Sequence, residues 1–439
     1  MLDIKYIREN PDKVKENLKK KFQEHKSSSV DEVIKLDEEY RALIKEANNL
    51  KHKRNQITEE IKVKKANNQD ITELLQQAKE YPNKIKEMDE RLKKLKLDIF
   101  RLQSKIPNIV SEQTIIGKTE DENKEIERYG EPEEKDFEIL NHAEISEKLN
   151  ITDFDASRDV AGKGFYYLKG DLALLNNALL RYAQDFLANK GYTYILPPLM
   201  INKKSCDGVI DFEFFRDMVY KIENEDLYLI GTSEHPLIAM FINKVIPEKN
   251  LPIKMFGYSS CFRKEIGAHG LDERGLFRLH QFDKVEQVAI CKPEESIEIF
   301  DELKDNTVKL FTSLGLPTRV LEICTGDLGD HKYRQVDIEV WSPRKKSYIE
   351  VGSCSNLTEA QAIGLNIKVK GKDTKYYAHT LNNTAIATQR ALVTIIENYQ
   401  TKEGTIKVPE VLVPYMYGKT EIKKNKSFFW FFYLGEIND

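Results

Sequence analysis

The sequence predicts an α+β protein, with an N-terminal antiparallel coiled-coil hairpin followed by a domain built on a mostly antiparallel sheet flanked by helices. One observation behind this prediction is a repeat. From Leu36 to Ile106, apolar residues recur at alternating spacings of four and three, the period of a coiled coil. Beyond residue 190, segments typical of strands rarely alternate with helices, which favours an antiparallel sheet over a doubly wound one. A length of 439 residues also favours at least two domains.

The first element expected is a short helical region from Met1 to His25, in which Asn10 caps a helix and Pro11 is its first residue. Three serines at 27–29 are expected to break this pattern. The coiled-coil positions that follow are 36, 40, 43, 47, 50, 57 and 61, then 71, 74, 78, 81, 85, 88, 92, 95, 99, 102 and 106; Arg54 fills the one slot that is not apolar. Each helix is expected to be roughly 50 Å long. Pro82 is expected to kink the second helix or loosen one turn.

The connection between the two halves distinguishes a self-paired hairpin from a coiled coil that dimerises. Periodicity alone would fit dimerisation, but a connection of five residues, 66–70, between near-equal halves favours the hairpin. Residues 1–110 hold 26 Lys and Arg against 20 Asp and Glu, a net charge of +6 in a chain whose total is −4. The basic residues near the outer half are Lys51, Lys53, Arg54, Lys62, Lys64 and Lys65. Several of these are expected to be merely solvated.

The second region follows a polar linker at 117–136 and is expected to contain both helices and strands. Helices are predicted at 172–188, 294–314 and 385–399. Strands are predicted at 191–198, which ends in two prolines, and at 212–222, 227–230, 318–324, 335–341 and 346–352. This order is typical of a domain in which helices flank a sheet.

The stretch from Cys261 to Glu286, CFRKEIGAHGLDERGLFRLHQFDKVE, is predicted to be a β-hairpin. Alternation gives each strand one polar face, made of Cys261, Arg263 and Glu265 on the first strand and of Arg278, His280, Phe282, Lys284 and Glu286 on the second. Guanidinium groups pair with phosphate oxygens, and an aromatic ring stacks on a nucleobase, so these faces suit a nucleotide. Taken alone, the stretch fits a hairpin with a solvated polar face equally well.

Three further motifs accompany this hairpin: Gly231-Thr232-Ser233-Glu234-His235-Pro236 upstream, and YIEVGSCSN from Tyr348 and HTLNNTAIATQR from His379 downstream. With all four motifs in this order, the chain from Met1 to about Tyr415 resembles the seryl-tRNA synthetases of the common, zinc-free type, which are class II aminoacyl-tRNA synthetases. The Asn-x-Thr pattern of Asn382 and Thr384 resembles the archaeal and eukaryotic branch. The resemblance implies a tRNA-binding domain with a helical arm at 1–110, a catalytic domain at 111–418, and a C-terminal tail of unknown role at 419–439.

By this resemblance, the chain activates L-serine with ATP and Mg²⁺ and transfers the seryl group to the terminal adenosine of tRNA(Ser), with tRNA(Sec) a second candidate acceptor. The residues implied as catalytic are Arg263, Glu286 and Arg390. Those implied in ATP binding are Arg263, Lys264, Glu265, Arg274, Leu279, His280, Gln281, Phe282, Glu350, Val351, Gly352, Ser353 and Arg390. In the family, Arg263 would hold the α-phosphate, Phe282 would stack on adenine, and Glu350 would bind magnesium.

The resemblance implies a serine pocket made of Thr232, Ser233, Glu234, Arg263, Glu286, Asn382 and Thr384. A carboxylate suits an ammonium and a hydroxyl alike, so the group of serine that Glu286 contacts stays open. A site that hydrogen-bonds the substrate hydroxyl rejects alanine, because its own polar groups would otherwise stay unpaired. Threonine must be excluded by shape.

The resemblance also implies a homodimer through the helix–strand–proline unit at 172–198, and tRNA(Ser) bound by the coiled-coil arm. No stretch approaches 18 consecutive apolar residues and no signal peptide opens the chain, so we expect a cytoplasmic protein without a membrane partner. Five scattered cysteines without C-x-x-C spacing predict reduced thiols and no zinc site. His331 and His379 have no ligand-spaced companions, and we expect neither to bind a metal.

Three other interpretations differ in what they explain. A non-catalytic relative should have lost part of the set Arg263, Glu265, Phe282, Glu286 and Arg390, all of which are present. A coiled-coil interaction protein would explain residues 36–106 alone, and relatives that serylate a carrier protein resemble forms without the arm. Two features depart from the family: Ile363-Gly364 stands where relatives usually carry two arginines, and the aromatic tail beyond Tyr417 has no counterpart.

Overall fold

The structure of the protein is a computed structural model that describes residues 1–210, 216–265 and 275–425. The chain divides into two compact units, Met1–Ile109 and Val110–Asp439. Each unit has its own hydrophobic core.

The first unit is helical throughout. Its elements are α1 (Ile4–Glu9), α2 (Pro11–Lys20), η1 (Glu24–Lys26), α3 (Ser27–Ala66) and α4 (Thr72–Lys105). Pro11 is the first residue of α2, as predicted, where a missing N–H costs no intrahelical bond. The expectation that the serines at 27–29 interrupt the helical pattern is wrong, because α3 begins at Ser27. Serine is well tolerated at a helix start, where the first N–H groups have no intrahelical partner.

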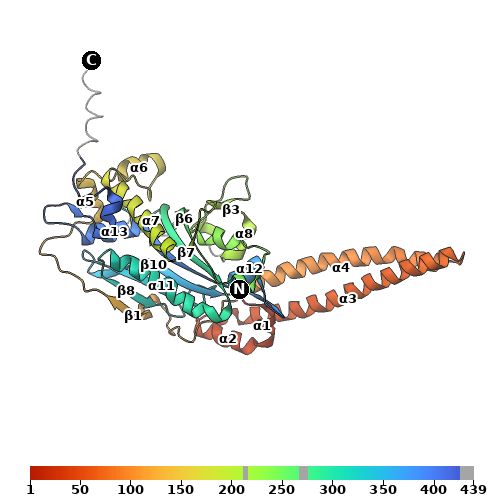
Figure 1. The fold of residues 1–439 in the computed structure, drawn as a ribbon. Helices are drawn as coiled ribbons and strands as arrows, with labels where there is room; N and C mark the ends of the chain where they lie inside the picture. Colours follow the sequence, from red (N-terminus) through yellow and green to blue (C-terminus); the bar gives the residue numbers. More distant parts are fainter. Residues whose placement is uncertain (211–215, 266–274, 426–439) are drawn as a thin grey trace, which may run out of the picture. The chain divides into compact units, whose positions relative to one another are not determined.

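Helices α3 and α4 form the predicted antiparallel hairpin (Figure 1). Every predicted coiled-coil position is buried or half-buried, whereas Arg54 is exposed. Two ion pairs join the helices, Lys51 with Asp89 at 3.0 Å and Glu39 with Arg91 at 2.5 Å. Helix α4 continues through Pro82. At its base the hairpin packs on α1 and α2, but none of residues 48–84 is fully buried.

The second unit is built on an eight-stranded sheet with the order β1-β8-β9-β10-β13-β7-β6-β2. Its strands are β1 (Lys124–Tyr129), β2 (Thr193–Ile195), β6 (Ile253–Phe262), β7 (Gln281–Cys291), β8 (Thr318–Glu322), β9 (Arg334–Ser342), β10 (Ser347–Thr358) and β13 (His379–Ala387). Neighbouring strands are antiparallel except for β2 and β6. The predicted mostly antiparallel sheet is therefore confirmed.

Helices cover the two faces of this sheet differently. They are α5 (His142–Lys148), α6 (Phe154–Ala161), α7 (Asp171–Asn189), α8 (Lys203–Val209), α10 (Glu234–Ala239), α11 (Ser296–Ser313), α12 (Ala360–Leu365) and α13 (Thr388–Asn398). Val285 and Ala289 of β7 belong to the core that α7, α11 and α13 share. Val288 and Ile290 alternate to the opposite face, where they pack with α8, α10 and α12. Further along that opposite face, β7 carries the polar residues of the candidate site.

Four predicted elements of the second unit differ from the structure. The polar linker predicted at 117–136 contains β1, which pairs with β8 at the edge of the sheet. The helix predicted at 385–399 begins only at Thr388, because β13 continues to Ala387; a short apolar run does not distinguish a buried strand from a helix. The strand predicted at 191–198 is limited to β2. Of the strand predicted at 212–222, residues 211–215 lie outside the described part, Arg216–Met218 is the 3-10 helix η3, and Lys221 forms a single bridge with Tyr228.

Shorter strands complete the second unit. These are β3 (Met200–Ile201) with β4 (Tyr228–Leu229), β5 (Val245–Pro247) with β11 (Lys368–Lys370) and β12 (Lys375–Tyr377), and β14 (Ile406–Lys407) with β15 (Glu421–Ile422). Ile422 is fully buried, so the first residues of the predicted tail pack on the second unit. The aromatic residues 428–434 of that tail lie outside the described residues. Among the described residues, no helix combines the length and apolarity needed to cross a bilayer.

The Ile363-Gly364 departure has a structural reason. A Cβ atom at residue 364 would lie 2.6 Å from the carbonyl oxygen of Gly208, so α12 meets α8 in backbone contact. Any larger side chain at 364 would push the two helices apart, which accounts for glycine here.

Candidate active site

The β6–β7 hairpin places Arg263 beside Phe282. Arg263 directly follows β6, and its guanidinium carbon lies 5.1 Å from the centre of the Phe282 ring. Its Nε and Nη2 donate to the carbonyl oxygen of Gly231 at 3.3 and 3.2 Å. A guanidinium and an aromatic ring, groups suited to a phosphate and a nucleobase, are thereby held together next to the loop that carries Thr232.

The polar face predicted for the second strand is shorter than expected. Strand β7 begins at Gln281, so Arg278 and His280 precede it, and only Phe282, Lys284 and Glu286 share a strand face. His280 has a supporting role: its ring stacks on Phe165 at 5.4 Å, and its backbone oxygen accepts from Arg263 N at 3.0 Å.

The other residues predicted around this hairpin differ in whether their side chains can face a ligand. Lys264 lies over the Tyr220 ring at 5.7 Å, and Glu265 has a left-handed backbone with φ +44°. The Leu279 side chain is buried in the main core, as is that of Val351 on β10, so neither presents its side chain to a ligand. Arg274 lies outside the described residues.

A buried ionic group occupies the centre of the site face. Lys284 Nζ lies 2.5 Å from Glu286 Oε2, and their side chains are 7% and 2% exposed. Thr384 is paired with Glu286 in the β13–β7 register, and its hydroxyl donates to Glu286 Oε2 at 3.2 Å. The Glu286 carboxylate is therefore oriented from two sides. Alternation had placed Lys284 on this polar face with Phe282 and Glu286, but no role in binding was predicted for it.

The first residue of α10, Glu234, supplies a second carboxylate. Gln361 of α12 donates to Glu234 Oε1 at 2.6 Å. Burial, and then the nearby Glu286 carboxylate, raise the pKa of Glu234 to about 7. Thr232 lies next to it, its hydroxyl accepting from Glu234 N at 3.3 Å. Ser233 points elsewhere, because its buried hydroxyl donates to the carbonyl of Gly257 at 3.1 Å.

Arg390 and Glu350 meet at the β10 side of the site. Arg390 lies in the first turn of α13, and its Nη1 is 3.0 Å from Glu350 Oε2 and donates to Glu350 O at 3.1 Å. The Phe277 ring, which the sequence did not suggest, lies 5.5 Å from the Arg390 guanidinium. Arg390, predicted to bind ATP, and Glu350, predicted to bind magnesium, are thus in contact.

Hard oxygen donors gather around Glu350. Asp337 faces Ser353 in the β9–β10 register, and burial followed by the Glu350 charge raises the pKa of Asp337 to about 7. Carboxylate and hydroxyl oxygens on adjacent strands are ligands that Mg²⁺ accepts, so the donor set fits that ion. Nothing in the sequence around Asp337 pointed to it, because only strand pairing brings it to Glu350.

The two histidines considered as metal ligands are half-buried. Burial lowers the pKa of His379 to about 4 and that of His331 well below its ordinary value. Within the described ranges, no three His, Cys, Asp or Glu side chains gather as a metal cluster, and the five cysteines are buried and free.

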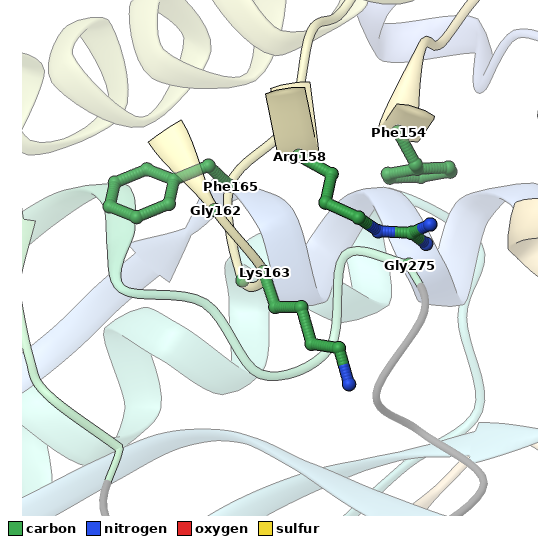
Figure 2. A pocket seen from close by; sticks show the side chains of 7 residues that line it. Phe154, Arg158, Gly162, Lys163, Phe165 and Gly275 are labelled. Carbon is green, nitrogen blue, oxygen red and sulfur yellow. The ribbon is translucent and has the colours of Figure 1, made fainter. Parts of the chain in front are cut away.

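A small cavity of about 120 Å³ lies between residues 154–165 and Gly275 (Figure 2). Figure 2 shows Arg158 and Lys163 among its lining side chains, with the rings of Phe154 and Phe165. None of the predicted ATP or serine ligands within the described residues lines it.

Two arginines and an aromatic ring beside an antiparallel sheet differ from the parallel-strand sites that hold nucleotides at helix N-termini. An antiparallel sheet with this arrangement is typical of a class II aminoacyl-tRNA synthetase. Residues 218–399 match the family described as "tRNA synthetase class II core domain (G, H, P, S and T)", and residues 1–110 match "Seryl-tRNA synthetase N-terminal domain".

Full-length relatives specify the family. A serine–tRNA ligase from Methanocella arvoryzae is 46% identical over 421 residues, which cover 95% of this chain and 99% of the relative. A seryl-tRNA synthetase from Pyrococcus horikoshii, in a crystal structure with ATP, is 41% identical with a TM-score of 0.88, covering 97% of this chain and 100% of that one. A cytoplasmic serine–tRNA ligase from Naegleria fowleri, in complex with AMP, is 37% identical with a TM-score of 0.84, covering 97% and 99%. The chain belongs to the seryl-tRNA synthetase family, as its motifs predicted.

Proposed function

We propose that this protein is a serine–tRNA ligase whose two steps both take place on the polar face of β7, β10 and β13. In the first step a serine carboxylate oxygen attacks the α-phosphorus of ATP, the bond to the β-phosphate breaks, and pyrophosphate leaves. In the second, a ribose hydroxyl of the tRNA terminal adenosine attacks the seryl carbonyl, and AMP leaves. The observation that carries the proposal is the buried Lys284–Glu286–Thr384 group beside Arg263.

Arg263, Phe282 and Arg390 are the proposed ATP ligands. A guanidinium offers paired donors to phosphate oxygens and stabilises negative charge that develops during displacement. Phe282 supplies the surface for adenine, and Arg390 reaches the terminal phosphate. Mg²⁺ bound through Glu350 and Ser353 would neutralise charge on the phosphates. Catalysis then depends chiefly on positioning, because this type of displacement needs little covalent help.

Glu234 and Glu286 are the proposed serine ligands, with Thr232, Asn382 and Thr384 completing the pocket. Asn382 and Thr384 alternate onto the same face of β13. Two carboxylates can receive the ammonium and the hydroxyl of serine, and the hydroxyl contact separates serine from alanine.

The hairpin of α3 and α4 is the proposed tRNA(Ser) arm. RNA duplexes are recognised mostly through phosphates and 2′-hydroxyls, which requires basic side chains on a stiff support. Lys53 and Lys65 are exposed, and within the fully described first unit neither forms an ion pair. Acceptance of tRNA(Sec) by the same arm and a cytoplasmic location belong to this proposal.

A homodimer is proposed through the region of β2. This strand is an edge of the sheet, and apolar side chains near it are exposed, with Tyr194 at 46% and Leu196 at 72%. Exposed edges and apolar side chains are common at subunit interfaces.

The test of the function is ATP–pyrophosphate exchange measured with each amino acid. Serine alone should support rapid exchange. Glu286→Gln should raise the serine KM at least about 30-fold, because truncating one partner of a buried charge pair costs ~2 kcal/mol or more. The ATP KM should change less than about twofold, since the substitution removes no phosphate contact. Exchange driven by another amino acid, or a Glu286→Gln effect confined to ATP, would contradict the proposal.

A further inference from the structure

The reverse face of the β7–β13 pair carries a buried polar group directly behind the serine pocket. Gln287 and Asn383 are opposite each other in the register, one step from the Glu286–Thr384 pair. Alternation turns their side chains away from the pocket, and both are fully buried against α11. Neither residue can touch a substrate on the site face.

One hydroxyl of α11 connects these two strands. Thr307 donates to the carbonyl oxygen of Thr384 at 2.8 Å. It accepts from Asn383 Nδ2 at 2.9 Å and from Gln287 Nε2 at 3.2 Å. A hydroxyl has one hydrogen to donate and two lone pairs, so Thr307, which is 0% exposed, uses its full hydrogen-bonding capacity here.

The backbone that Thr307 contacts is irregular. The β13–β7 register shifts between Thr384 and Ile386, which is a β-bulge. A bulge redirects a side chain at the cost of regular pairing, so its conformation needs support from outside the ladder. Gly352 of β10 closes the same space, since a Cβ there would lie 3.1 Å from Thr384 O and 3.3 Å from Thr307 Cγ2.

We propose that Thr307 is a positioning residue for serine recognition, acting through the backbone of Thr384 from behind the sheet. Holding the Thr384 carbonyl orients the residue so that its hydroxyl reaches Glu286 Oε2, and the carboxylate is in turn aimed at the amino acid. Binding sites of this kind lose selectivity when a ligand group is displaced by about 0.5 Å. The inference rests on the proposed role of Glu286 and Thr384 in the serine pocket.

We expect that the Thr307 hydroxyl can be removed without unfolding the protein, because the amides that contact it have other hydrogen-bond partners. Both amides also donate to the carbonyl of Leu303, Asn383 at 2.6 Å and Gln287 at 3.4 Å. They therefore keep a partner on α11 when the Thr307 hydroxyl is removed. Thr384 O loses the bond that reaches it from α11, so the change is concentrated at the pocket.

The experiment compares Thr307→Val, which keeps the shape but removes the hydroxyl, with Thr307→Ser, which keeps the hydroxyl. The matched control is Thr318→Val in β8, where a fully buried hydroxyl donates locally to Leu316 O at 2.9 Å. In ATP–pyrophosphate exchange, Thr307→Val should raise the serine KM about tenfold, the effect of one buried polar group left unpaired. The ATP KM should stay within about twofold, and preference for serine over threonine should fall. Thr307→Ser should behave as the unsubstituted protein.

A double-mutant cycle tests the route through Thr384. In a Thr384→Val background, Thr307→Val should raise the serine KM little further, because both changes act on the same hydrogen bond that orients Glu286. Additive effects would overturn the proposal, as would a parallel rise of the serine and ATP KM values or a failure of Thr307→Ser to restore selectivity. If Thr307→Val does not fold, Thr307→Cys, with its weak donor, replaces it in the same comparison. Failure of Glu286→Gln to affect serine would refute the proposed function itself, whereas a Glu286 effect without a Thr307 effect refutes this inference alone.

Discussion

The α3–α4 hairpin and the β7–β13 pair both display charged side chains, but they hold them differently. In the hairpin, residues 48–84 include no fully buried side chain, and the charges belong to exposed or locally paired residues such as Lys62 with Glu59. In the sheet, Glu286 is 2% exposed and is oriented by residues of its own and a neighbouring strand. The comparison teaches that charges on the arm should act independently and additively, whereas those of the site should act as one group.

The largest effect on activity is expected from Arg263, the proposed ligand of the ATP α-phosphate. Arg263→Ala should lower serine-dependent pyrophosphate exchange by about 10³-fold, because it removes a charge-assisted contact to phosphate where negative charge develops. Arg128→Ala on β1 is the matched control, since that exposed arginine pairs with Glu125 of its own strand at 2.7 Å and otherwise lies over the Tyr348 ring at 5.6 Å. Circular dichroism of both variants should match the unsubstituted protein. Near-normal pyrophosphate exchange by Arg263→Ala would contradict the assignment of the ATP site to the β6–β7 hairpin.

Shortening the arm should impair tRNA charging but not ATP–pyrophosphate exchange. We expect replacement of Lys53–Lys84 by a short Gly-Ser linker to leave the fold intact, because none of these residues is fully buried and the Lys51–Asp89 pair is retained. Pyrophosphate exchange should change little, while tRNA charging should fall about 100-fold as several phosphate contacts disappear. Equal loss of both activities would mean that the arm is needed for folding. Unchanged charging would mean that it is not the tRNA-binding element.

The raised pKa of Glu234 predicts that the serine KM depends on pH. With its pKa raised to about 7, Glu234 is mostly protonated at pH 6 and mostly ionised at pH 8. Only the ionised form attracts the serine ammonium, so the serine KM should fall up to about tenfold as pH rises across this range. Glu234→Gln should flatten the profile at a higher KM. A serine KM that is independent of pH in the unsubstituted protein would show that Glu234 does not bind the ammonium.

The smallest effects should come from single arm lysines. Lys53→Ala and Lys65→Ala should each reduce the slope of log K for tRNA binding against log salt by about 1 unit, with additive losses in the double variant. Lys62→Ala is the control, because that lysine pairs with Glu59 at 2.5 Å. Filter binding at several salt concentrations measures all four proteins. Strongly non-additive losses would show that the arm lysines are energetically coupled, as the charges of the site are, and would contradict the comparison.

The sequence by itself determined the arm, because a coiled-coil seam is a local pattern. Partners lie three or four residues apart on one helix, so the heptad positions and the five-residue connection were sufficient to predict the hairpin. The motifs around Arg263, Glu286 and Arg390 were also readable, since each is a short run of residues. Local pattern did not locate the end of β13, where an apolar strand runs into an apolar helix.

The tertiary structure alone decided which side chains act together. Alternation placed Lys284 on the face of Glu286, but the contact of Gln361 with Glu234, and that of Thr307 with Thr384, join residues more than 70 positions apart. Asp337 and Glu350 come together only through the β9–β10 register. Burial then shifts the pKa values of Glu234 and Asp337, and burial is a property of the folded core rather than of neighbouring residues in the chain. Sequence pattern can therefore name the reacting residues, while long-range packing sets their charge and orientation.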